Sequence, residues 1–433
     1  MQMPNLKLYW CLPLLIAASC GSGGPKPSSM EFKTIPVTYP ETRRDTTVSD
    51  VYFGTTIKDP YRWLEDDQSD ETKAWVQAQN KVSFGYLEQI PFRGKIKERL
   101  EEIWDFEKFG TPFKKAGTYY FFKNDGLQNQ SVLYRQETLD GEAQVVLDPN
   151  TFSADGTTSL QEYSFSKDGR YLAYAISEGG SDWRTILVKD LQSGELLADK
   201  IQWAKFTGIG WAGNGFYYTR YPEPKAGDKL KGANQSSAIY FHQLGAEQSA
   251  DKLVYSDKAH PNYYFNAGTT DDERFLYLYG AESTSGNMLY VKDMSKPNAN
   301  FVPIYTKFDH DFTVVENIGD QLLVLTNHGA PNQRLIRISP AQPDPANWQT
   351  VIPENADAVL QSAAVCGDKI IWRYLHNASS ALRVFDLEGK PLKEIALPEI
   401  GTVAAVRGER EDQQAFFSFQ SFLRPSTIYT LDM

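Results

Sequence analysis

The chain has 433 residues, of which 41% are hydrophobic and 23% charged, a balance that suits a globular protein with a sizeable core. Its formal net charge of −11 and the lack of a basic stripe exclude nucleic acid as a partner, because binding phosphates requires clustered Lys and Arg. The 24 Tyr, 24 Phe and 9 Trp suit pleated, half-buried surfaces.

Residues 1–20 have the pattern of an export signal. Lys7 precedes the apolar run Leu8–Ala18, which is too short to span a bilayer as a mature helix. Small residues then lead to Cys20 and a Gly/Ser stretch, an arrangement that resembles a bacterial lipoprotein signal with Cys20 as the lipid-modified residue. Plain secretion is the alternative. We expect a protein of the bacterial cell envelope or periplasm that touches the membrane only through a lipid anchor.

Residues 21–38 read as a linker, and residues 39–106 as a short helical segment. Ser69 or Asp70 can cap a first helix. A second helix is expected after Gly94. Each has apolar residues at three- and four-residue spacing: Trp75, Ala78, Val82 and Tyr86 in the first, and Ile96, Leu100 and Ile103 in the second. Both apolar faces need a surface to pack against, because short helices are marginal alone.

From about Phe109 onward the apolar period becomes two, and one short motif occurs seven times. Successive copies are separated by 53, 53, 50, 46, 47 and 46 residues. This spacing predicts an all-β seven-bladed β-propeller over residues 107–433. The pattern leaves open whether the ring closes; closure would depend on side-chain packing between its first and last blades. The copies are Leu133–Tyr134, Ile186–Leu187, Ile239–Tyr240, Leu289–Tyr290, Leu335–Ile336, Leu382–Arg383 and Ile428–Tyr429.

No catalytic, metal or cofactor site is expected in these repeats. The chain has no G-x-S-x-G string, and its five His are dispersed without metal-ligand spacing. Residues 208–213 match G-x-G-x-x-G, but the strand-like run that follows favours an inner blade strand over a dinucleotide site. Cys366 lies in an apolar run and is expected to be buried.

Several strings resemble the prolyl oligopeptidase family. They are DPYRWLED (59–66), AQNK (78–81), GLQNQSVLY (126–134), FSKDGRYLAY (165–174), GSDW (180–183) and SFLRPSTIY (421–429). The resemblance covers about residues 39–433. It implies a propeller that covers an α/β-hydrolase domain, which cleaves short peptides after proline with a Ser-Asp-His triad. Residues 39–106 would be the N-terminal piece of that domain, and no triad residue can be assigned here.

The resemblance carries two roles over to residues of the propeller. Phe206 matches an aromatic residue that lines the distal substrate pocket, and Asp182 matches an acid that pairs with an arginine of the catalytic half. Ordinary structural roles stay open for both, as a core phenylalanine and as a turn cap.

We therefore expect the N-terminal and propeller portion of a prolyl-oligopeptidase-like serine endopeptidase, inactive by itself, whose propeller gates access for short proline-containing peptides. The catalytic half would belong to a longer chain or to a separately encoded α/β-hydrolase polypeptide. The alternative is a stand-alone envelope-anchored propeller that binds peptide or carbohydrate. The apolar helix faces favour a catalytic half, in the same chain or in a separate polypeptide, because a chain that acts alone would expose them.

Overall fold

The computed structural model describes residues 34–225, 228–229 and 232–433. The predicted export signal and Cys20 therefore lie outside the described residues. The chain divides into two compact units, one up to Lys95 and the other from Ile96 to Met433. Among the described residues, no helix is both long and apolar enough to cross a membrane.

The first unit contains a β-hairpin and a long helix. Strands β1 (Ser49–Tyr52) and β2 (Thr55–Lys58) pair antiparallel, and the turn η1 (Arg62–Glu65) precedes α1 (Asp70–Glu88). Ser69 caps α1 as predicted, because its side-chain oxygen accepts a hydrogen bond from the Thr72 amide at 3.2 Å. The predicted face of α1 is half-buried from Trp75 to Val82, and the Trp75 indole donates to the Thr42 hydroxyl at 2.9 Å.

The second helix, α2 (Arg93–Trp104), is split by the unit boundary. It begins one residue before Gly94, so Gly94 lies inside the helix and does not precede it as predicted. None of its residues is buried, and its predicted apolar face is exposed at Ile96, Leu100 and Ile103. Its charged side chains pair along the helix surface, as between Lys97 and Glu101 at 3.3 Å.

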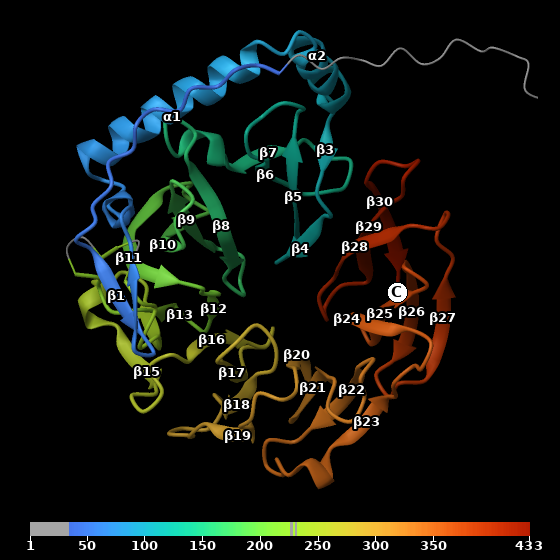
Figure 1. Ribbon diagram of the computed structural model, residues 1–433. Helices are drawn as coiled ribbons and strands as arrows, with labels where there is room; N and C mark the ends of the chain where they lie inside the picture. Colours follow the sequence, from blue (N-terminus) through green and yellow to red (C-terminus); the bar gives the residue numbers. More distant parts are fainter. Residues whose placement is uncertain (1–33, 226–227, 230–231) are drawn as a thin grey trace, which may run out of the picture. The chain divides into compact units, whose positions relative to one another are not determined.

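The second unit consists of seven antiparallel groups of strands arranged around a central opening (Figure 1), which confirms the predicted seven-bladed propeller. The first three groups are β3 (Lys108–Phe109), β4 (Phe113–Lys115), β5 (Thr118–Asn124), β6 (Val132–Gln136) and β7 (Gln144–Leu147); β8 (Thr158–Phe165), β9 (Tyr171–Glu178), β10 (Trp183–Asp190) and β11 (Leu196–Lys205); and β12 (Gly210–Trp211), β13 (Gly215–Arg220), β14 (Ala238–Gln243) and β15 (Lys252–Ser256).

The remaining four groups follow in chain order. They are β16 (Tyr264–Thr269), β17 (Phe275–Ala281), β18 (Met288–Asp293) and β19 (Val302–Tyr305); β20 (Phe312–Ile318), β21 (Gln321–Thr326), β22 (Arg334–Ile338) and β23 (Gln349–Ile352); β24 (Val359–Cys366), β25 (Lys369–His376), β26 (Ser379–Asp386) and β27 (Pro391–Ile395); and β28 (Thr402–Arg407), β29 (Gln414–Gln420) and β30 (Thr427–Asp432). Short 3₁₀ turns η2 (Pro149–Thr151), η3 (Gln248–Ala250) and η4 (Pro345–Asn347) lie in the connections.

The seven-fold motif marks the third strand of every blade. In six blades the first residue of the pair has no solvent exposure, because it points into the core between neighbouring sheets. These residues are Leu133, Ile186, Ile239, Leu289, Leu335 and Leu382. The seventh, Ile428, is only half-buried. The repeat that identifies the fold is thus a repeat of buried positions.

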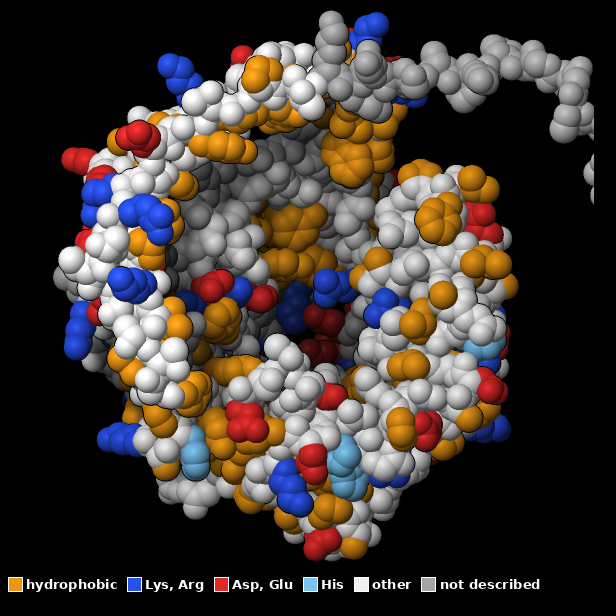
Figure 2. Space-filling view, viewed as in Figure 1, with side chains coloured by type: hydrophobic (Ala, Val, Ile, Leu, Met, Phe, Trp, Pro, Cys, Tyr) orange, Lys and Arg blue, Asp and Glu red, His pale blue; other side chains and the backbone are white. Residues whose placement is uncertain are grey.

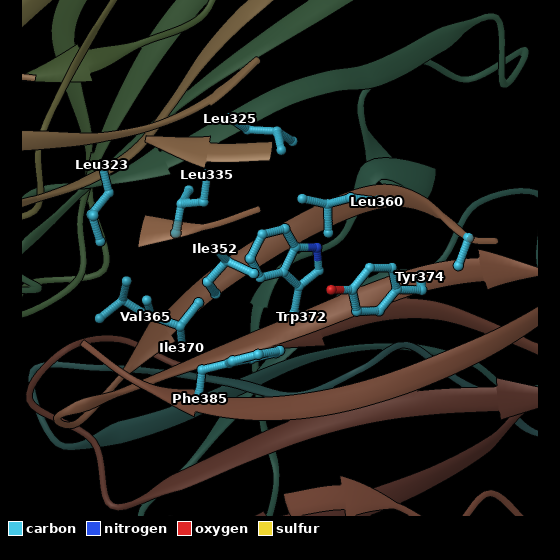
Figure 3. Packing of buried hydrophobic residues seen from close by; sticks show 11 residues of the cluster. Leu323, Leu325, Leu335, Ile352, Leu360, Val365, Ile370, Trp372, Tyr374 and Phe385 are labelled. Atoms are coloured by element: carbon cyan, nitrogen blue, oxygen red, sulfur yellow. The ribbon is translucent and has the colours of Figure 1, made fainter. Parts of the chain in front are cut away.

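Apolar clusters fill the spaces between adjacent sheets. The cluster in Figure 3 joins the fifth and sixth blades, with Leu335 and Ile352 on one side and Ile370 and Phe385 on the other, around the fully buried ring of Trp372. Packing of this kind between sheets supplies most of the folding free energy. Cys366 is fully buried, as predicted.

No strand hydrogen bonds join the first blade to the last among the described residues. Side chains connect them instead: Lys115 pairs with Glu409 at 3.1 Å, and the rings of Tyr119 and Phe416 meet edge to face at 6.1 Å. Side-chain contacts therefore bridge the first and last blades, which settles a point that the sequence had left open.

The second and third blades, in contrast, form one continuous eight-stranded sheet. Ala204 of β11 pairs with Arg220 of β13. The G-x-G-x-x-G match lies at this junction. Gly210 belongs to the inner strand β12, and a Cβ there would come within 3.1 Å of the Gly268 Cα. Close packing of inner strands, and not cofactor binding, explains this glycine.

A buried histidine reinforces the same junction. The ring nitrogens of His242 lie 2.9 Å from Asp199 Oδ1 and 2.7 Å from Asp251 Oδ1, and the Tyr218 hydroxyl donates to Asp251 at 2.6 Å. Where both carboxylates are ionised they can only accept, so both ring nitrogens then donate and the ring is an imidazolium. Burial lowers the pKa of His242, but the two carboxylates outweigh it and hold the pKa above its ordinary value.

Candidate functional site

The two carried-over residues lie at the same end of the propeller. Asp182 is in the turn between the second and third strands of the second blade, and Phe206 is in the connection from its fourth strand to the third blade. In an up-and-down meander these connections share one end. The turns between first and second strands, such as Lys167–Arg170, lie at the opposite end.

Lys205 links the two residues. Its ammonium lies 3.7 Å from Asp182 Oδ2 and donates to Asn234 Oδ1 at 2.8 Å. It also lies 4.9 Å from the ring centre of Trp183 and 5.3 Å from that of Phe206, within cation–π range. The Lys205 side chain is only 10% exposed, so these partners hold its charge in place.

Aromatic rings extend this cluster. Trp183 meets Trp203 edge to face at 5.5 Å and Tyr221 at 6.3 Å, and Tyr221 in turn contacts Phe206 at 6.4 Å. Tyr221 is buried, whereas 43% of Phe206 is exposed. We call Asp182, Trp183, Trp203, Lys205, Phe206 and Tyr221 the aromatic cluster.

The backbone of the aromatic cluster is strained. Trp203 and Phe206 have φ angles of 60° and 50°, a region that bulky residues rarely adopt and that costs on the order of 1–3 kcal/mol each. The surrounding structure holds them there. Arg184 donates to the carbonyl of Thr207 at 3.1 Å, and the Tyr221 amide donates to the Trp203 carbonyl at 3.1 Å. Strain of this kind concentrates at functional sites.

The aromatic cluster can bind a ligand, but it lacks the groups for hydrolysis. Its exposed aromatic ring and carboxylate suit an apolar or cationic group, and it has no activated hydroxyl. Side-chain hydrogen bonds of the described histidines go to Asp199, Asp251, Asp257 and Asn377, never to a serine. No cluster of potential metal ligands occurs among the described residues.

The central channel runs between the inner strands. A cavity of about 330 Å³ is lined by residues of five blades, among them Phe113, Tyr163, Trp211, Thr269 and Arg407. Figure 2 shows charged side chains of both signs deep inside the opening.

Charged groups crowd the end of the channel opposite the aromatic cluster. Contacts there cross between blades that are not neighbours: Lys167 of the second blade donates to the Asp272 carbonyl of the fourth at 3.3 Å, and Arg410 of the seventh donates to the Asn317 carbonyl of the fifth at 2.8 Å. Burial, together with the charge of nearby Asp271, raises the pKa of Glu316 to about 8. Polar contacts therefore bridge non-neighbouring blades at this end of the channel.

The structure thus brings Asp182 and Phe206 into one cluster, although their family roles stay predictions. Phe206 is not enclosed in the core, and 63% of the Asp182 side chain is exposed. In the turn that contains Asp182, the Trp183 amide donates to Ser181 Oγ and not to Asp182. Sequence reasoning missed Trp203, Lys205 and Tyr221. The run Trp203–Phe206 (WAKF) was the available signal, because it interleaves aromatic rings with a cation beside the Phe206 already singled out.

Comparison with known proteins agrees with this architecture. The family model for the N-terminal β-propeller domain of prolyl oligopeptidase matches residues 40–433. The chain is 42% identical over 392 residues to a prolyl endopeptidase of Elizabethkingia miricola, covering 90% of this chain and 55% of the relative. Prolyl oligopeptidase A of Amanita bisporigera is 32% identical over 413 residues, which cover 87% of this chain and 54% of the relative.

Solved structures show the same likeness. Prolyl oligopeptidase B from Galerina marginata, bound to a 35mer hydrolysis and macrocyclization substrate, superposes with a TM-score of 0.81 at 29% identity over 92% of this chain and 58% of that one. The chain spans about half the length of the curated relatives it matches. It belongs to the prolyl oligopeptidase family, and residues 40–433 correspond to the N-terminal β-propeller domain.

Proposed function

We propose that this chain is the N-terminal and propeller portion of a prolyl-oligopeptidase-like serine endopeptidase that cleaves short peptides after proline. The observation that carries the proposal is the family match over residues 40–433, together with a relative named prolyl endopeptidase of which the matched region covers only 55%. The propeller's own task is to select and admit substrate.

The channel supports this gating role. Its cavity of about 330 Å³ is far smaller than a folded domain, and polar contacts bridge non-neighbouring blades at its far end. The aromatic cluster lies at the other end. There Phe206 would contribute to the distal substrate pocket, and Asp182 would pair with an arginine of the catalytic half. Its present partner, Lys205, lies at 3.7 Å, so the Asp182 carboxylate is largely free to accept another cation.

Hydrolysis requires a triad that the described residues do not contain, since none of their histidines bonds a serine. An α/β-hydrolase domain, in a longer chain or in a separate polypeptide, would supply it. The exposed apolar face of α2 supports this, because Ile96, Leu100 and Ile103 have a surface suited to packing against such a domain. Residues 1–20 would place the assembly in the bacterial envelope, with Cys20 as the lipid anchor.

The aromatic cluster also favours a second candidate function. An exposed phenylalanine beside two tryptophans can stack on a proline ring or a sugar, so a stand-alone propeller could bind peptide or carbohydrate without cleaving it. This alternative predicts affinity for such ligands by the isolated chain and no gain from a hydrolase domain.

Reconstitution tests the proposal. The purified chain is mixed with the hydrolase domain of the Elizabethkingia miricola relative, and cleavage of a blocked Gly-Pro-p-nitroanilide is followed. We expect no cleavage by the chain alone, cleavage by the mixture, and a lower kcat/KM for the Phe206→Ala mixture. Phe422→Ala is the matched control, because Phe422 is fully exposed and lies in a different blade. If the chain alone cleaves the substrate, or if the mixture equals the hydrolase domain alone, the proposal is wrong.

A further inference from the structure

The seven-fold motif has a charged member in the sixth blade. In five other blades the second residue of the pair packs into the apolar core shared with the preceding blade. The sixth blade has Arg383 at this position, on the face of β26 that also carries Phe385 and packs against the fifth blade. The apolar counterparts are Leu187, Tyr240, Tyr290, Ile336 and Tyr429.

A cavity of about 670 Å³ lies beside Arg383, within the size range of small-molecule sites. It is bounded by the two outer strands of the sixth blade, β26 and β27, and by residues 352–356 at the end of the fifth blade. We call it the inter-blade groove. Its apolar lining combines buried residues of the core in Figure 3 with exposed ones. The buried residues are Ile352, Tyr374 and Phe385, and the exposed ones are Pro353, Pro391 and Leu392.

The guanidinium of Arg383 is positioned in this groove by two neighbours. It lies 5.3 Å from the ring centre of Tyr374, and its Nε donates to Glu394 Oε2 at 3.0 Å. Among the described residues Arg383 donates no other hydrogen bond, so its terminal nitrogens are open to an acceptor. The two side chains are 38% and 64% exposed, and an exposed ion pair of this kind contributes little stability. A second carboxylate can therefore join Glu394 or replace it.

The facing wall of the groove is held in place by Asn332 of the fifth blade. Its Nδ2 donates to the carbonyls of Asn355 at 3.0 Å and Ala356 at 3.2 Å, and its amide donates to Glu354 Oε1 at 2.6 Å. These contacts fix the segment and engage the Glu354 carboxylate. Lys393 adds a second cation to the lining. The groove thus combines a preformed apolar surface with two cations, one of which has free donors.

We propose that the inter-blade groove binds a small apolar carboxylate. Its aromatic or aliphatic body would pack against Tyr374 and Phe385, and its carboxylate would accept two hydrogen bonds from the terminal nitrogens of Arg383. A neutral apolar molecule would cover these donors without satisfying them, and a cation would meet two like charges. The groove lies on the outer strands, apart from the aromatic cluster and the central channel, so the inference does not depend on the proposed function.

A matched pair of ligands tests the carboxylate. Para-fluorobenzoate and para-fluorobenzamide have the same shape but differ in charge, and fluorine NMR follows the binding of each to the purified chain. We expect the benzoate to bind at least tenfold more tightly than the benzamide. Equal affinity for the two ligands, or no binding of the benzoate at millimolar concentration, would overturn the inference.

Three variants then locate the site. Arg383→Leu introduces the residue type that the second blade has at Leu187, so the fold should tolerate it, and thermal unfolding checks this. It should weaken benzoate binding at least tenfold and leave benzamide binding within twofold. Arg424→Leu is the control, because Arg424 also donates to a glutamate, Glu399, at 3.0 Å but does not line the groove. Undiminished benzoate binding by Arg383→Leu, or equal losses in both variants, would overturn the inference.

Glu394→Gln keeps the test decisive even if Arg383→Leu does not fold. The Glu394 side chain is largely exposed, so its replacement should leave the fold intact. Because this carboxylate competes for Arg383 and repels an anion, the variant should bind the benzoate at least twofold more tightly. Unchanged or weaker binding would refute the role of Arg383. Self-association of the chain that Arg383→Leu abolishes, as seen by sedimentation velocity, would assign the groove to a second copy and would also overturn the inference.

Discussion

Replacing His242 by alanine should destabilise the propeller strongly. The imidazolium lies between Asp199 and Asp251, whose side chains are 2% and 1% exposed. Removing it leaves two buried carboxylates that have lost their shared cation, and breaking a buried ion pair in this way costs about 3–5 kcal/mol. His260→Ala is the control. That ring is 53% exposed and pairs with Asp257, so its loss should cost at most about 1 kcal/mol.

The pH dependence identifies the charge as the cause. The pKa of His242 is raised in the folded state, so its contribution is fully present below the unfolded value of 6.5 and is lost as pH rises through the folded pKa. Urea unfolding, followed by tryptophan fluorescence between pH 6 and 10, should show the difference between wild type and His242→Ala shrinking as pH rises. If this difference in stability stays constant across the pH range, His242 is not charged in the folded protein. If His242→Ala costs no more than His260→Ala, the contacts of His242 with Asp199 and Asp251 do not stabilise the fold strongly.

Three further outcomes follow from the structure. Leu382→Ala should lower the free energy of unfolding by about 2–5 kcal/mol, whereas Ile428→Ala should cost clearly less because its site is only half-buried; denaturant midpoints of the two variants decide this, and equal costs would contradict it. Glu316→Gln should remove a carboxyl whose pKa is raised from 4.5 to about 8 in the folded protein, so the variant should match wild type in stability below pH 4.5, gain on it as the pH rises, and keep a constant advantage above pH 8, as measured by thermal unfolding. Cys20→Ala should abolish incorporation of labelled palmitate in a bacterial expression host, and retained label would exclude Cys20 as the lipidated residue.

Much of the propeller could be predicted from the sequence because its strongest signal is physical. The first residue of each pair must be large and apolar where it is sealed between two sheets, as at Leu289 and Leu335, so the repeat survives although the surrounding residues vary. The fourth strands left a weaker signal. The apolar residue with which each one covers the pair, for instance Tyr255 opposite Ile239, becomes visible only once the register of the strands is known.

The site was less predictable because its parts are distant in the sequence. Trp183 and Tyr221 meet only after two blades have folded, and the positive φ angles of Trp203 and Phe206 run against the preferences of bulky residues. Nothing in the sequence distinguishes His242 from the other four histidines, because its partners Asp199 and Asp251 come from separate segments. Long-range contacts of this kind have no local pattern from which to infer them.

The fused sheet of the second and third blades has a mechanical consequence. Because Ala204 pairs with Arg220 and His242 clamps the same junction, the two blades should move as a single stiff body while the other inter-blade joints flex. Every member of the aromatic cluster, from Asp182 to Tyr221, belongs to this body. Motions of the other blades can therefore widen or narrow the route to the aromatic cluster without changing the geometry of the cluster itself. Access of a ligand and its binding would then depend on different parts of the propeller.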